Sequence, residues 1–102
     1  MIHVLAIITA KPGQRETILK AARENLAAVR AENGCIEYGP VVDADAGAFQ
    51  ALLGPDTFVV IEKWKDMDAL NAHGVAPHMK AFGAKVKDLV ASRAIHVLTS
   101  AE

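Results

Sequence analysis

The stretch Phe58-Val-Val-Ile-Glu-Lys-Trp64 decides how this chain folds. Its β-branched and aromatic residues favour a buried strand over Thr57–Trp64. Side chains alternate between the two faces of a strand, so four of them share one face: Phe58, Val60, Glu62 and Trp64. Burying a charge is costly unless the charge is paired or protonated. The carboxylate among these apolar groups therefore indicates that the face lines a pocket rather than a sealed core.

The composition suits one compact domain over residues 1–102, because 52% of the residues are hydrophobic and 23% are charged. A domain of this size buries only part of its surface, so the apolar surplus indicates that some surface closes against a second subunit. The net charge of −1 gives no reason to propose nucleic acid or an anionic membrane as a partner.

A single cysteine, Cys35, excludes an intrachain disulfide, which fits the reducing cytosol. The apolar N-terminus lacks a basic region, and Lys11-Pro12-Gly13 interrupts it after too few residues for a signal peptide or a membrane span. We therefore expect a cytoplasmic protein without a membrane-spanning segment.

The rest of the chain alternates between strand and helix signals. A long amphipathic helix ends at Asn33-Gly34, and Pro77 suits the first turn of a later helix. A short helix containing Met67, Leu70 and Asn71 precedes it. The predicted elements are strands over Ile2–Ala10, Cys35–Val42, Thr57–Trp64 and Ala94–Thr99, and a long helix over Gln14–Ala31.

This order is the split βαβ arrangement of an α+β, ferredoxin-like fold with an antiparallel sheet. Right-handed crossovers place both helices on one face of the sheet. The opposite face is apolar too, so either a second subunit covers it or the sheet curls around a cavity. His3 and His96 fall on neighbouring strands, but the sequence does not fix their register.

The segment Asp43–Asp56 is rich in turn-forming residues, and we expect a short helical turn over Ala48–Leu53. Phe49, Leu52 and Leu53 are apolar residues in a loop, which must cover either the pocket or a partner subunit.

Two interpretations of Glu62 and Trp64 are open. In the first, a core Trp lies beside a carboxylate that is paired with a Lys or Arg. In the second, Trp64 stacks on a flat aromatic ligand and Glu62 handles a proton. His73 lies beyond the strand as a candidate base, and the phenol of Tyr38 needs a partner if it is buried. His73 and His78 lack metal-ligand spacing, so we expect no metal site. No phosphate-binding glycine loop is present, so a tightly bound flavin or nicotinamide is not expected either.

At these residues the chain resembles the antibiotic biosynthesis monooxygenase domain family, including its quinol monooxygenase branch. The resemblance covers nearly the whole length. Its pieces are Lys11-Pro12-Gly13, Asn33-Gly34-Cys35-Ile-Glu-Tyr38, Phe58-Val-Val-Ile-Glu-Lys-Trp64, Leu70-Asn-Ala-His73 and Ala76-Pro-His-Met-Lys-Ala-Phe82. The resemblance implies a homodimer whose two sheets meet as a dimeric α+β barrel, with one pocket per subunit.

The resemblance also implies a cofactor-independent monooxygenase, which joins a hydroxylated aromatic or quinol-like substrate to molecular oxygen without a metal or organic cofactor. It makes Trp64 and Tyr38 substrate contacts, His73 and Glu62 the groups that handle the proton, and Asn71 the residue that orients a hydroxyl or peroxide. A non-catalytic small-molecule-binding dimer is the main alternative. A haem-binding or haem-degrading protein is a weaker one, because Ile2–Ala10 lacks the Asn of that branch.

Overall fold

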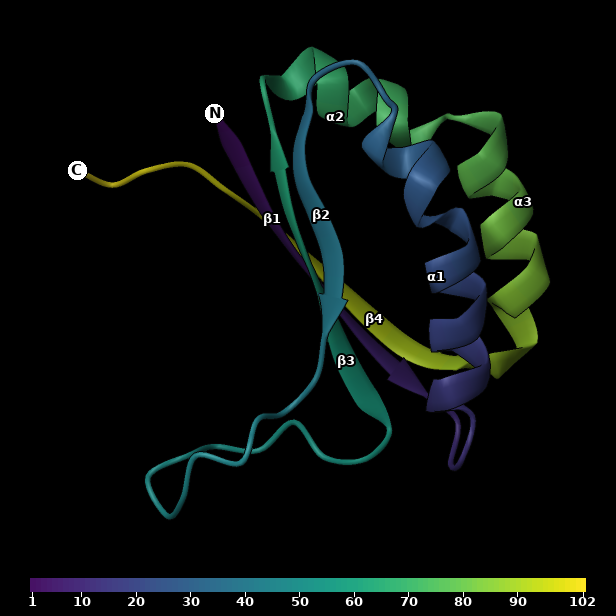
Figure 1. Cartoon of the computed structure of the whole chain (residues 1–102), viewed down its shortest axis with the longest axis vertical. Helices are drawn as coiled ribbons and strands as arrows, with labels where there is room; N and C mark the ends of the chain where they lie inside the picture. Colours follow the sequence, from purple (N-terminus) through teal and green to yellow (C-terminus); the bar gives the residue numbers. More distant parts are fainter.

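The computed structural model covers residues 1–102 and has the architecture that the sequence predicts (Figure 1). Its elements, in chain order, are β1 (Ile2–Ala10), α1 (Arg15–Arg30), β2 (Cys35–Val41), β3 (Thr57–Trp64), α2 (Met67–Gly74), α3 (Pro77–Val86), the short 3₁₀ turn η1 (Lys87–Leu89) and β4 (Val90–Leu98). The predicted bounds of β3 are confirmed, whereas β4 begins four residues before the predicted Ala94. None of the helices is both long enough and apolar enough to cross a membrane.

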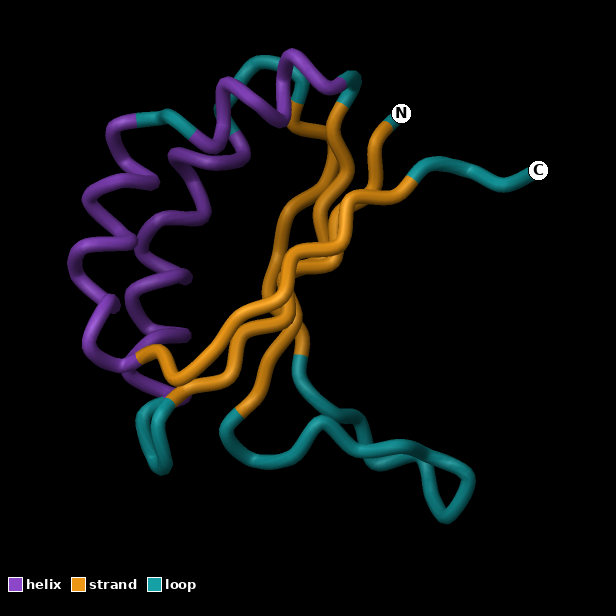
Figure 2. The backbone as a smooth tube through the Cα atoms, turned by 180° about the vertical axis from the view of Figure 1, so that it is seen from behind, coloured by secondary structure: helices purple, strands orange, loops and turns teal.

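The four strands form one antiparallel sheet in the order β2-β3-β1-β4. This order and the element sequence are those of the ferredoxin-like fold, which confirms the predicted fold class. All three helices lie on the same side of the sheet, as right-handed crossovers require (Figure 2).

The core lies between the sheet and α1. Burial along β3 alternates strictly, and the four side chains predicted to share one face are the four that are buried: Phe58, Val60, Glu62 and Trp64. Ile18, Leu19 and Val29 bury one stripe of α1 against them. This alternation places the carboxylate of Glu62 beneath the helices.

The register of β1 and β4 separates the two strand histidines. His3 lies opposite Leu98, and His96 lies opposite Leu5. Both histidines belong to the face of the sheet that points away from the helices, but they do not form a pair.

That second face of the sheet has no cover within the chain (Figure 2). By the alternation of β1, β3 and β4 it carries the apolar side chains Leu5, Ile7, Val59, Ile61 and Leu98. None of these five residues is fully buried, although all except Leu98 lie on the two central strands, β1 and β3, where side chains are typical of a core. We call these five residues the open sheet face.

Residues 42–56 form an extended arm rather than the helical turn expected over Ala48–Leu53, so that prediction was wrong. The carboxylate of Asp43 accepts hydrogen bonds from the backbone N–H groups of Leu53 and Gly54 at 2.9 and 3.0 Å. The side chain of Gln50 bonds to backbone atoms of Ala44 and Ala46. These bonds offer the backbone an alternative to helical pairing. The arm extends away from the helical side of the sheet, with Phe49 88% exposed (Figures 1 and 2).

Gly34 fixes the turn that joins α1 to β2. Its φ is +86°, and a Cβ at this position would lie 2.6 Å from Cβ of Ala69 in α2. Gly13 has a similar φ of +78° but has no neighbouring atom within 4 Å. An alanine substitution at Gly13 therefore tests the backbone conformation alone, whereas one at Gly34 tests the backbone conformation and the close packing together.

We expect Gly34→Ala to lower the free energy of unfolding more than Gly13→Ala does. A left-handed conformation costs a non-glycine residue about 1–2 kcal/mol in either variant, and only Gly34→Ala adds the clash with Ala69. Urea unfolding measures both variants, and a second change, Ala69→Gly, should restore part of the loss. Equal destabilisation by the two alanine variants would show that the packing against α2 is not tight.

Candidate functional site

A cavity of about 690 Å³ lies between the sheet and helices α1 and α3. Most of its wall is apolar, with Val60 from the sheet, Leu26 from α1 and Phe82 from α3 as examples. Polar side chains gather where β2, β3 and α2 meet: Tyr38, Glu62 and His73. A largely apolar cavity with a few convergent polar groups is the usual form of a small-molecule site.

Glu62 is only 5% exposed, yet no Lys or Arg pairs with it. Its Oε1 accepts a hydrogen bond from Nε1 of Trp64 at 2.9 Å. Burial raises the pKa of this carboxyl group, and the Trp64 bond and the nearby His73 oppose that rise. No Lys or Arg of the same chain forms the ion pair that the first interpretation requires, and burial gives Glu62 the character of an acid that stays protonated above the usual pH.

Trp64 lies behind the cavity wall rather than in it. Its side chain is fully buried and does not line the cavity. Its ring packs against His73, with the two centroids 4.6 Å apart and the planes tilted by 36°. The substrate contact that the family resemblance implies for Trp64 is not available in this geometry. Trp64 instead holds Glu62 through one hydrogen bond and supports the imidazole of His73 from behind.

His73 comes from the last turn of α2, and its imidazole is held by a residue that the sequence did not single out. Nδ1 of His73 lies 2.8 Å from Oε2 of Glu32, which follows the end of α1. A carboxylate only accepts hydrogen bonds, so Nδ1 carries the hydrogen and Nε2 keeps the lone pair. Nε2 has no hydrogen-bond partner in the chain and is not fully buried, and His73 is one of the residues that line the cavity. The bond to Glu32 thus fixes the orientation of the His73 imidazole.

Glu32 escaped the sequence analysis because 41 residues separate it from His73. One signal points to it in retrospect. Glu32 lies in the turn that leads into Cys35, and Cys35 lies opposite Trp64 in the β2–β3 pair. The turn therefore brings the carboxylate of Glu32 to the Trp64 end of β3.

His78 approaches the same carboxylate from the first turn of α3. Its Nε2 lies 3.3 Å from Oε2 of Glu32. The angle is unsuitable for a hydrogen bond, so both ring nitrogens of His78 are buried without a partner. One carboxylate oxygen therefore lies within reach of two imidazoles, one of which faces the cavity.

Tyr38 lies directly opposite Glu62 across the β2–β3 pair. Its ring meets His73 edge-on, with centroids 5.4 Å apart, and meets Trp64 at 6.4 Å. Burial, followed by the negative charge of Glu62, raises the pKa of the phenol well above its ordinary value. Tyr38 therefore stays protonated near neutral pH and keeps an O–H group that can donate a hydrogen bond.

Asn71 does not join this group. It is exposed on α2 and does not line the cavity. The expected role in orienting a hydroxyl has no support in its position. The chain also contains no group of three or more His, Cys, Asp or Glu side chains arranged to hold a metal ion.

Comparisons with family models, with known sequences and with solved structures all indicate the same family. The family model described as "Antibiotic biosynthesis monooxygenase" matches residues 1–85. The Escherichia coli K12 protein named "Probable quinol monooxygenase YgiN" is 38% identical over 100 residues, which are 96% of each chain. "Putative monooxygenase YcnE" of Bacillus subtilis is 35% identical over 90% of this chain and 88% of its own. The crystal structure of PA3566 from Pseudomonas aeruginosa superposes with a TM-score of 0.81 at 29% identity, over 99% of this chain and 94% of its own.

The raised pKa of Glu62 predicts a specific pH dependence of stability. The folded protein holds this proton more tightly than the unfolded chain, so stability falls as the pH rises above the ordinary carboxyl value of 4.5. Gln at this position still accepts the Trp64 bond but does not ionise. We expect the stability of Glu62→Gln relative to the wild type to increase from pH 4.5 towards neutrality. Urea unfolding across this range tests it, and a constant difference would show that Glu62 titrates normally.

Proposed function

Because this chain belongs to the antibiotic biosynthesis monooxygenase family, we propose that it uses molecular oxygen to hydroxylate a quinol-like aromatic substrate without a cofactor. The observation that carries this proposal is the apolar cavity of about 690 Å³ with Glu62, His73 and Tyr38 together in its wall. Its volume suits a ligand of two or three aromatic rings. The name of the E. coli relative supports the same substrate class.

In the proposed reaction, Nε2 of His73 takes the proton from a substrate hydroxyl. The resulting aromatic anion is electron-rich and passes one electron to molecular oxygen. The substrate radical and superoxide then combine to form a carbon-bound peroxide, and loss of water leaves a new carbonyl or hydroxyl group on the ring. One hydroquinone and one oxygen molecule become one hydroxyquinone and one water. The chain supplies the orientation, the base and an apolar surrounding in which water does not compete.

Two further side chains assist these steps in the proposed mechanism. The phenol of Tyr38 donates a hydrogen bond to a substrate or peroxide oxygen. Glu62, which holds its proton above the usual pH, supplies that proton as the peroxide loses water. Trp64 touches neither reacting atom, and it positions both Glu62 and His73.

We propose in addition that the working form is a homodimer formed through the open sheet face. An apolar sheet surface of this kind is usually covered in a stable protein. The arm leaves the same side of the sheet, so a second copy on this face would meet the exposed Phe49 and Leu52. The arm points away from the helices that enclose its own cavity, which favours the partner subunit over the pocket as its contact.

Oxygen uptake with naphthohydroquinone tests the proposed reaction. We expect uptake above autoxidation for the wild type in the presence of a metal chelator. His73→Gln should lower kcat by about 100-fold or more, because the general base is lost. Asp68→Asn, an exposed change on the same helix, serves as the control and should leave kcat unchanged.

The alternative of a binding protein gives a different result in the same assay. Naphthoquinone would bind to the wild type and quench the fluorescence of the single Trp, but no enzyme-dependent oxygen uptake would follow. That combination would contradict the proposed reaction while leaving the cavity as a ligand site.

Sedimentation tests the proposed dimer. We expect the wild type to sediment as a dimer at micromolar concentration, and Ile7→Lys to sediment as a monomer because it buries a charge in the middle of the open sheet face. Phe49→Ser should weaken the dimer without changing the fold. A wild type that is monomeric at this concentration would contradict the proposed interface.

A further inference from the structure

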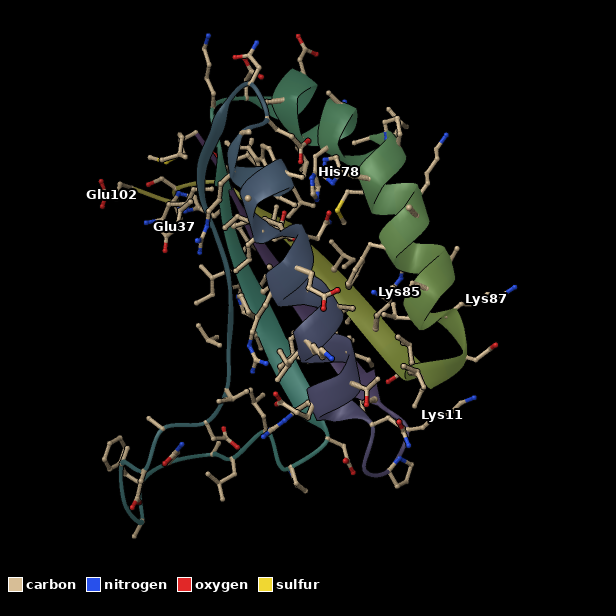
Figure 3. All side chains as sticks on the ribbon, turned by 45° about the vertical axis from the view of Figure 1, so that its right-hand side comes forward. Lys11, Glu37, His78, Lys85, Lys87 and Glu102 are labelled. Carbon is tan, nitrogen blue, oxygen red and sulfur yellow. The ribbon has the colours of Figure 1, made fainter.

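The two histidines around Glu32 connect the cavity with the outer surface of the helices. His73 lines the cavity and contacts Glu32 at 2.8 Å. His78 lies 3.3 Å from the same oxygen, and it also lines a separate depression of about 230 Å³ on α1 and α3. Figure 3 shows His78 between these two helices. The three side chains therefore cross the protein layer that divides the two spaces.

The state of His78 is unusual for a residue with a purely structural role. Both of its ring nitrogens are buried without a hydrogen bond, although a carboxylate oxygen lies within reach. A buried polar group without a partner costs about 1–3 kcal/mol, and such exceptions are rare in folded proteins. Nε2 already lies 3.3 Å from Oε2 of Glu32, and no hydrogen bond holds the ring in its present orientation. His78 is thus free to make and break its contact with Glu32.

We propose that His73, Glu32 and His78 form a proton-transfer route between the cavity and the depression on α1 and α3. This inference rests on the proposed function, since it begins with His73 as the base. In this route, Glu32 positions His73. His78 connects Glu32 to solvent.

Each step of the proposed route breaks one bond to a proton and forms another. The substrate O–H bond breaks as Nε2 of His73 gains the proton, and Nδ1 of His73 then releases its own proton to Oε2 of Glu32. Glu32 passes this proton to Nε2 of His78. Because Nδ1 of His78 is buried, the ring, whose side chain is 27% exposed, must turn before Nδ1 releases a proton to water in the depression. Glu62 gives its proton to the peroxide as water is lost. One proton that then returns by the same route and passes from Nε2 of His73 to Glu62 restores the acid and every tautomer, so no net charge accumulates.

Titratable groups face the route at both of its ends. Glu62 and Tyr38 face His73 from the cavity side. Glu24 and Lys85 line the depression near His78, and they pair with each other at 3.1 Å. Moving the positive charge from His73 towards the surface leaves the aromatic anion without a counter-charge beside it. An unpaired anion in an apolar cavity gives up an electron to oxygen more readily than a paired one.

The test uses His78→Ala and Glu32→Gln with naphthohydroquinone as substrate. We expect kcat to fall about tenfold or more in both variants, with the Kd for naphthoquinone unchanged and with a larger solvent deuterium isotope effect on kcat. Free imidazole should restore activity to His78→Ala, because it enters the space that the side chain leaves beside the depression. Lys85→Gln lines the same depression outside the route and should behave as the wild type does.

Other outcomes overturn the proposal. A wild-type kcat and isotope effect in His78→Ala would show that no proton passes through this residue. A loss of kcat that is matched by a loss of naphthoquinone binding and not restored by imidazole would show a structural role only. Both results require oxygen uptake by the wild type, so they differ from the failure of the proposed function, in which the wild type itself takes up no oxygen.

Discussion

The hydrogen bond from Trp64 to Glu62 within the buried face of β3 is the interaction on which the site depends. It allows a carboxyl group to lie beneath the helices without a cationic partner. The same indole packs against His73, so one residue contacts both the proposed acid and the proposed base. Removing water from both groups strengthens every electrostatic interaction between them and a bound molecule. The cavity is therefore chemically organised before any ligand enters.

The fold could be predicted from the sequence wherever the side-chain pattern was strong. The alternation in β3 and the apolar stripe of α1 fixed those elements almost to the residue, since burial selects the pattern directly. The start of β4 was missed because Ser92 and Arg93 weaken its strand signal, and pairing with β1 extends the strand through them. The arm was misjudged because Asp43 and Gln50 satisfy its backbone through side-chain bonds that no periodicity reveals.

The site was predictable in part, for a related reason. Glu62, His73 and Tyr38 were identified from residue type and strand parity, and the structure brings all three to one cavity wall. Glu32 was missed because its contact with His73 joins distant parts of the chain. Trp64 was placed on the correct face, but it lies behind the cavity wall, since parity gives the direction of a side chain and not the depth at which the cavity begins. Asn71 was carried over from a resemblance and lies outside the cavity.

The most direct test of the central claim is the source of the oxygen atom in the product. The wild type would convert naphthohydroquinone under dioxygen labelled with oxygen-18. Mass spectrometry would then measure the mass of the product. The proposed mechanism predicts that one labelled atom enters the ring product and the other leaves as water. A product without the label, or the same labelled product at the same rate without the protein, would contradict the account.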